Sequence, residues 1–120
     1  MREEALRNIL GQLNATSADI QASAVISTDG LMMASLLPQG LDQDRMGAMS
    51  AALLSLGSRV ARELDRGTPE QVLVKGDNGY VLMLQAGNDA VLTVLASTQA
   101  KLGLIFLDAK RAAASMAQVL

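Results

Sequence analysis

Residues 46–66, MGAMSAALLSLGSRVARELDR, constrain the fold most, because they predict one helix with two non-polar faces. At about 100° per residue, the large side chains fall in one arc: Met46, Met49, Leu53, Leu56, Val60 and Leu64. A second arc consists almost entirely of small residues: Gly47, Ser50, Ala51, Leu54, Gly57, Ser58 and Ala61. A helix of this kind needs a partner on two sides, so the rest of the fold has to cover more than one face.

We expect the arc of large side chains to pack on a sheet. The arc of small residues has two interpretations. Small residues let two helices approach closely, so this arc is predicted to be the seam of a homodimer with its two-fold axis between equivalent helices. Alternatively, the small residues accommodate a neighbouring loop or helix of the same chain. The strand that follows would extend the seam by pairing with its two-fold mate if it lies at a sheet edge; its seam residues are Val72, Leu73 and Val74.

The remaining elements follow from periodicity and turn residues, and their order is α–β–β–α–β–β–β–α. The expected elements are a helix at 2–14, strands at 20–28 and 31–37, a helix at 42–66, strands at 70–75, 80–86 and 90–96, and a helix at 102–119. Asp29-Gly30 and Asn78-Gly79 supply hairpin turns, while Asp42 caps the middle helix and Gly67 ends it. Because several strands are apolar on both faces, the middle helix should cover one side of the sheet and the terminal helices the other.

The length of 120 residues predicts a single domain over residues 1–120. Charged residues make up 18% of the chain, below the usual value of about 25%, which suggests apolar surface buried in an oligomer. The chain has no Cys and no His, so thiolate chemistry, zinc binding and histidine acid–base catalysis have no residues to use. No catalytic residue, cofactor or metal is therefore predicted.

Charge and hydropathy exclude two further classes of partner. The net charge is −2 with no basic block, so nucleic-acid binding is not predicted. The longest uncharged run, Met46–Ser58, has 13 residues, fewer than the approximately 20 that a membrane-spanning helix needs, so no membrane insertion is predicted. Two glutamates precede any apolar run near residue 1, so we expect no signal peptide and a cytoplasmic location.

The polar strip of the middle helix carries Ser55, Arg59 and Arg62. One interpretation is a solvated helix face, with Arg59 beside Glu63 and Arg62 near the acidic and basic residues that follow. The other is a basic ridge, doubled by the two-fold axis, that binds an acidic surface of a protein partner. These three residues are the predicted partner-binding site.

Four segments together resemble the roadblock family, named for dynein light chains, whose bacterial and archaeal members include MglB-like regulators. The segments are ISTDGLMMAS (26–35), VLVKGDNGYVLML (72–84), AVLTVLA (90–96) and LGLIFLDAKRAA (102–113). The resemblance implies a profilin-like, three-layer α/β sandwich with a five-stranded antiparallel sheet in the order 2-1-5-4-3. It also implies homodimers formed through the second helix and third strand.

The same resemblance implies a function. Family members are non-enzymatic platforms that bind or regulate Ras-like small GTPases, and MglB-like members activate the GTPase without inserting an arginine. The predicted function is a cytoplasmic homodimeric adaptor or regulator that binds a Ras-like small GTPase and modulates its GTPase cycle. The alternatives are a purely structural dimerisation module and a small-molecule sensor, in which Gln85, Thr93 and Tyr80 offer polar groups between sheet and helix.

Overall fold

The computed structural model describes residues 1–120 and contains the eight predicted elements in the predicted order. Their bounds are α1 (Arg2–Ala15), β1 (Ile20–Ser27), β2 (Met32–Leu36), α2 (Gln43–Glu63), β3 (Val72–Gly76), β4 (Gly79–Ala86), β5 (Ala90–Ala96) and α3 (Leu102–Ala117). Each boundary lies within a few residues of the sequence expectation, as is usual for helix ends and strand ends.

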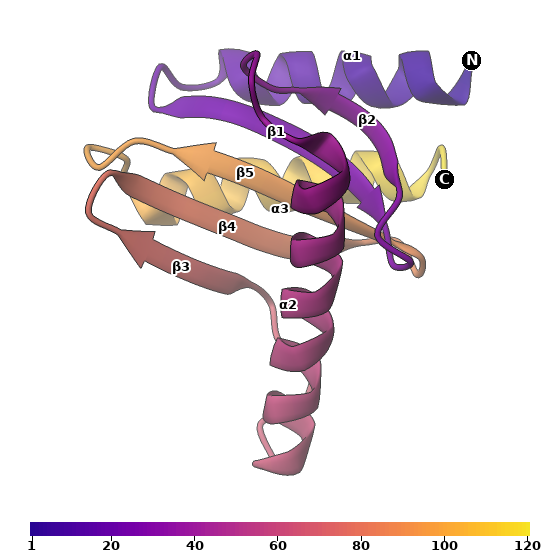
Figure 1. Cartoon of the computed structure of the whole chain (residues 1–120), viewed down its shortest axis with the longest axis vertical. Coiled ribbons are helices and arrows are strands. Elements are labelled where there is room, and N and C mark those ends of the chain that lie inside the picture. Colours follow the sequence, from indigo (N-terminus) through magenta and orange to yellow (C-terminus); the bar gives the residue numbers. More distant parts are fainter.

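The strands form one antiparallel sheet in the order β2-β1-β5-β4-β3. The helix α2 crosses one face of this sheet, and α1 and α3 lie together on the other face (Figure 1). The predicted fold class, with one long helix on one side and two terminal helices on the other, is therefore confirmed. β3 pairs only with β4 and forms one edge of the sheet.

The hairpin between β3 and β4 is tighter than the sequence suggested. Gly76 lies opposite Gly79, so the two loop residues are Asp77 and Asn78, one position earlier than the expected Asn-Gly pair. Gly79 is the first residue of β4 and has φ 146°. A Cβ atom on Gly79 would collide with the carbonyl oxygen of Ala96 in the neighbouring strand. This glycine is therefore required by close strand packing as well as by the turn.

The two faces of the sheet carry very unequal cores. The cluster between the sheet and α1 with α3 contains 17 buried hydrophobic residues, including Leu6, Leu92 and Met116. The α2 side has only two clusters of three, one around Ile26 and one around Met83. The fold is thus held mainly by the α1/α3 layer, and the α2 side is left incompletely covered.

The orientation predicted for α2 is wrong. The buried residues of α2 are Met46, Gly47, Ser50, Ala51 and Leu54, so the arc of small residues faces the chain's own sheet and most of the large arc does not. The reason is the close approach that small residues permit: a Cβ on Gly47 would lie 2.5 Å from the carbonyl oxygen of Gly30, and one on Gly57 would lie 2.7 Å from Cγ2 of Val72. The alternative interpretation, in which the small residues accommodate a neighbouring part of the same chain, agrees better with the structure. The neighbouring part is the sheet, not a loop or a helix.

The end of α2 also differs from the expectation. Asp65, not Gly67, is the first left-handed residue after the helix, with φ 57°. The amide of Arg66 donates to the carbonyl of Ala61 at 2.6 Å and that of Asp65 donates to the carbonyl of Arg62 at 3.1 Å, which is the Schellman pattern. These two bonds satisfy carbonyl groups of the last helical turn, and Gly67, with φ 79°, follows two residues later.

Replacing Asp65 by glycine is expected to stabilise the protein by about 0.5 kcal/mol, because glycine adopts the left-handed conformation without a Cβ penalty. Urea denaturation followed by circular dichroism measures the change. Asp29→Gly is the matched control, since Asp29 is an exposed turn residue with ordinary negative φ. The control should be neutral or destabilising, and an equal gain in both variants would contradict the strain at Asp65.

Candidate functional site: the outer stripe of α2 and the β3 edge

The most unusual surface of the molecule is a stripe of large apolar side chains along α2. Its members are Met49, Leu56, Val60 and Leu64, which are 59%, 56%, 48% and 63% exposed; we call them the outer stripe. Their spacing places them on one side of the helix. Single exposed hydrophobic residues are ordinary on protein surfaces, whereas an aligned group of this kind marks an interaction surface.

The second half of α2 extends beyond its own sheet. All buried residues of this helix lie at or before Leu54, and Figure 1 shows the following turns projecting past β3, clear of the sheet. The side chains of Leu56 and Val60 remain about half exposed, although the helix continues to Glu63. A projecting, half-apolar helix of this length calls for a partner surface, because isolated helix turns gain little stability by themselves.

The strand β3 adds an open edge beside this helix. Four of its five residues are exposed, and Leu73 and Val74 are each 41% exposed. The outer backbone groups of an edge strand are free to pair with another strand. The side chain of Val72 lies under Gly57, so β3 and the projecting part of α2 are neighbours in one continuous surface.

The polar strip next to the outer stripe is accessible. Ser55, Arg59 and Arg62 are all exposed. Nε of Arg59 donates to Oε1 of Glu63 at 3.1 Å, as the solvated-face interpretation expected, and both side chains are largely in water. Such exposed pairs contribute only a few tenths of a kcal/mol, so they restrain Arg59 weakly. Whether these residues contact a partner stays a prediction.

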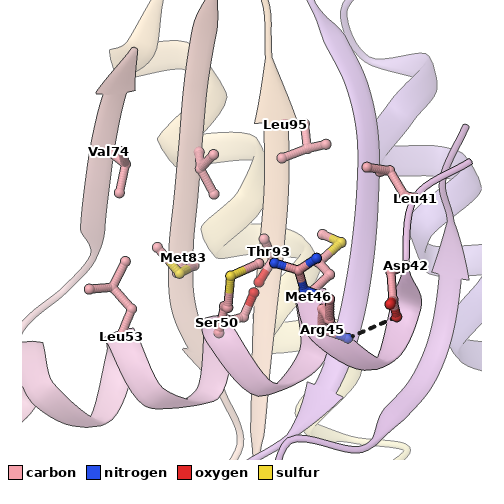
Figure 2. A pocket seen from close by; sticks show the side chains of 12 residues that line it. Leu41, Asp42, Arg45, Met46, Ser50, Leu53, Val74, Met83, Thr93 and Leu95 are labelled. Atoms are coloured by element: carbon pink, nitrogen blue, oxygen red, sulfur yellow. Dashed lines mark hydrogen bonds between the residues drawn. The ribbon is translucent and has the colours of Figure 1, made fainter.

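A hollow lies beside the N-terminal half of α2, over the part of the sheet that this helix leaves uncovered; we call it the α2–sheet hollow (Figure 2). Its volume is about 380 Å³, and it is lined by Leu41, Asp42, Arg45, Met46, Met49, Ser50, Leu53, Val74, Val81, Met83, Thr93 and Leu95. At one end, the side chain of Asp42 caps α2 by accepting a 3.1 Å hydrogen bond from the amide of Arg45. Thr93 is fully buried, and its Oγ1 has no hydrogen-bond partner.

The predicted seam residues do not share one environment. The chain's own sheet covers Gly47, Ser50, Ala51 and Leu54. These positions are therefore not free to form the predicted helix–helix seam of a homodimer. Gly57, Ser58 and Ala61 are half-buried, and Val72 is partly covered. The outer stripe was not predicted as contact surface. The sequence did contain a signal for the outer stripe, namely Gly47 and Gly57 on the opposite arc. Glycines permit close approach, so they mark the side of the helix that packs on the sheet.

The three polar candidates for a ligand site are also dispersed. Thr93 lines the α2–sheet hollow, whereas Gln85 does not. Gln85 is exposed and lies two positions after Met83 in β4, so its side chain is on the α2 face of the sheet but outside the hollow. Tyr80 does not line the hollow. Of this group, Thr93 alone is fully buried. None of the helices has both the length and the apolar character needed to cross a membrane.

Comparisons with known proteins agree with this architecture. A family model for the Roadblock/LC7 domain matches residues 8–96. Two uncharacterized proteins of Methanocaldococcus jannaschii are each 41% identical over 105 residues, covering 88% of this chain and 90% of theirs.

Solved structures give the same result at lower sequence identity. A Roadblock/LC7 domain from Streptomyces avermitilis superposes with a TM-score of 0.82 at 26% identity, covering 91% of this chain and 92% of that one. An MglB with a tetrameric arrangement gives a TM-score of 0.89 at 20% identity, with 98% and 89% covered. Profilin II of Acanthamoeba castellanii gives 0.70 at 14% identity, with 94% and 97% covered, so the fold is profilin-like.

Proposed function

This chain belongs to the Roadblock/LC7 family, and from that premise we propose that it is a non-enzymatic homodimeric platform for a Ras-like small GTPase. The observation that supports the proposal most is the outer stripe of α2 beside the open edge of β3. A surface of this kind serves protein contacts, since it presents apolar side chains and strand backbone together. The tetrameric arrangement of a related MglB fold also supports assembly.

The proposed dimer forms around a two-fold axis at the β3 edge. Antiparallel pairing of β3 with its mate would continue the sheet from one protomer into the next. With 21 residues, α2 is about 31 Å long, so its projecting half would extend across the axis towards the second protomer. The proposed seam uses the outer stripe at Leu56, Val60 and Leu64 together with Val72, Leu73 and Val74, and it replaces the small-residue seam drawn from the sequence.

The proposed GTPase surface is the polar strip beside this seam. Ser55, Arg59 and Arg62 lie on exposed turns of α2, and the two-fold axis would bring a second set close to the first. Two arginines from each protomer would then form a basic ridge on a protein whose net charge is −2. Such a ridge favours an acidic partner surface and chiefly accelerates its association.

The double variant Arg59→Glu/Arg62→Glu is expected to slow association with the cognate GTPase about tenfold at low salt, and the difference should shrink as salt rises. Stopped-flow or surface plasmon resonance measures the rate against a panel of small GTPases in GDP-bound and GTP-bound forms. Arg2→Glu/Arg111→Glu is the matched control, because it changes the net charge equally at exposed sites on α1 and α3.

Two results would contradict the platform proposal. One is the absence of binding to every GTPase of the panel in every nucleotide state. The other is an equal loss of rate in both double variants, which would show that the effect comes from net charge alone. A GTPase that binds the wild type and the control, with the α2 variant impaired, is the expected result, and a nucleotide hydrolysis assay on the same complexes shows whether binding alters turnover.

A further inference from the structure

The outer face of α3 carries a combination of side chains that the proposed function does not use. We propose that it is the docking surface for an acidic amphipathic helix of a second protein partner, distinct from the GTPase. Apolar residues of that helix pack on Leu104 and Leu107, and its carboxylates pair with Lys110 and Arg111. Because α3 lies on the opposite face of the sheet from α2 (Figure 1), both surfaces can be occupied at once, and the inference does not depend on the GTPase proposal.

Two large apolar side chains of α3 are exposed to solvent side by side. Leu104 and Leu107 are 58% and 55% exposed, and their three-residue spacing puts them next to each other on one side of the helix. The exposed Gly103 and Ala114 lie on the same side and are small, so a second helix can approach closely. The neighbouring helix α1 exposes no large apolar residue, so this pair distinguishes α3 within its layer and marks a contact site.

The charges beside the leucines have one sign. Lys110 and Arg111 follow Leu107 by one helical turn, and both are exposed. The only acidic residue of α3 is Asp108, whose side chain is mostly covered and lies 3.7 Å from Nη1 of Arg111. An exposed ion pair of this length restrains the arginine weakly. Nζ of Lys110 lies 5.8 Å from the centre of the Phe106 ring, a contact that leaves its N–H donors available. The surface therefore favours a partner that brings carboxylates.

The shape of the surface favours a helix as the incoming element. A groove of about 220 Å³ runs between α1 and α3, and its lining includes Ile9, Arg111 and Ala112. A smaller groove of about 130 Å³ is lined in part by Leu104, and the two grooves share Asp108. The helices cover the sheet on this face, so the surface presents side-chain ridges and grooves in which a helix can pack.

Charge also separates this partner from two other occupants. A second copy of the chain, in a two-fold contact between equivalent α3 helices, would bring Lys110 and Arg111 against the same two residues. A flat anionic membrane would approach α1 as well as α3, and α1 exposes Glu3 and Glu4 in its first turn. Both arrangements place like charges together, whereas an acidic helix is narrow enough to contact α3 alone.

The test uses a designed peptide as the probe. The peptide is a helix of about 18 residues, or five turns, with leucines along one side and glutamates beside them. Isotope-labelled protein is titrated with it and followed by NMR, and amide resonances of Leu104, Leu107 and Arg111 should shift. A peptide with lysine in place of every glutamate should bind at least about tenfold more weakly at low salt. An absence of shifts on α3, or equal affinity of the two peptides, would overturn the proposal.

Two variants remove the two parts of the surface separately. Leu104→Gln/Leu107→Gln keeps the helix propensity and the charge, and it should weaken binding of the acidic peptide at least about tenfold because the apolar contact is lost. Lys110→Glu/Arg111→Glu should weaken it by a similar factor at low salt, and the difference should shrink as salt rises. Wild-type affinity in either variant would overturn the role assigned to that part of the surface.

The matched control for the charge variant is Arg2→Glu/Arg66→Glu, which changes the net charge equally at exposed sites outside α3. The control should bind the acidic peptide as the wild type does. An equal loss of affinity in Arg2→Glu/Arg66→Glu and Lys110→Glu/Arg111→Glu would show that the effect comes from net charge, and it would overturn the proposal.

Flotation with phosphatidylserine vesicles and light scattering over a range of protein concentrations test the other two occupants. The expected results are no flotation, and the same molar mass for the wild type and Leu104→Gln/Leu107→Gln. Flotation that depends on Lys110 and Arg111, or larger assemblies that disappear in the leucine variant, would overturn the proposal. If no GTPase of the panel binds, the platform proposal fails while the peptide titration still gives its own answer.

Discussion

Replacing both Leu56 and Val60 by arginine is expected to convert the homodimer into a folded monomer. Both side chains lie on the outer stripe, and both are about half exposed in a single protomer, so the change leaves the chain's own core intact. In the dimer each arginine would bring an unpaired charge into an apolar seam, and the two-fold axis doubles the effect. Losses at the centre of such seams reach about 2–4 kcal/mol, so dissociation should become at least about 30-fold easier.

Light scattering coupled to size exclusion, from micromolar to submicromolar protein, measures this outcome. Leu104→Arg/Leu107→Arg is the matched control: these leucines are 58% and 55% exposed on α3, on the opposite side of the sheet. The control should remain a dimer, and both variants should keep the circular dichroism spectrum of the wild type. A wild-type protein that is monomeric at micromolar concentration, or a dimer that survives in the α2 variant, would refute the seam.

The second large effect is expected at Gly47, where alanine should destabilise the fold by about 2 kcal/mol. A methyl group there would lie 2.5 Å from the carbonyl oxygen and 3.4 Å from the carbonyl carbon of Gly30. The obstacle is backbone, so relief requires α2 or the β1–β2 turn to move. Alanine has a higher helix propensity than glycine by about 1 kcal/mol. The expected destabilisation is the net value after this gain is subtracted from the cost of the steric clash.

Thermal and urea denaturation measure the change at Gly47. Gly103→Ala is the matched control, because Gly103 is also helical and a Cβ there meets nothing within 4 Å. The control should be neutral or stabilising by up to about 1 kcal/mol. If Gly47→Ala were as stable as the control, the close contact between α2 and the β1–β2 turn would not be a real constraint. A dimer that persists in this variant would show that stability and assembly are separable.

Most of the architecture could be predicted because its signals are local. The hairpin turn at Gly30 and the cap at Asp42 each lie within a few neighbouring residues. The antiparallel pairs β1–β2, β3–β4 and β4–β5 follow from short connections of this kind. The strand order is different, since it depends on contacts distant in sequence; it came from the resemblance of four segments to a known family.

The two faces of α2 show where local signals end. A helical wheel gives the spacing of Gly47 and Gly57 but not the surface that each one meets. Those surfaces are Gly30 and Val72, which lie far along the chain, and a small residue serves a close helix–sheet contact as well as a close helix–helix contact. Thr93 is similar, because a threonine in a strand satisfies β propensity, and its missing partner becomes visible only when the neighbouring strands are in place.

The unequal cores on the two faces of the sheet bear on how proteins of this kind diverge. The α1/α3 layer holds the larger cluster, so mutations on the outer side of α2 remove little of what keeps the chain folded. Duplicated genes can therefore drift at those α2 positions and acquire new binding specificities while the shared scaffold is retained. The α2 side of the sheet, which has the smaller core, is therefore the part in which selection can change binding specificity at little cost in folding stability.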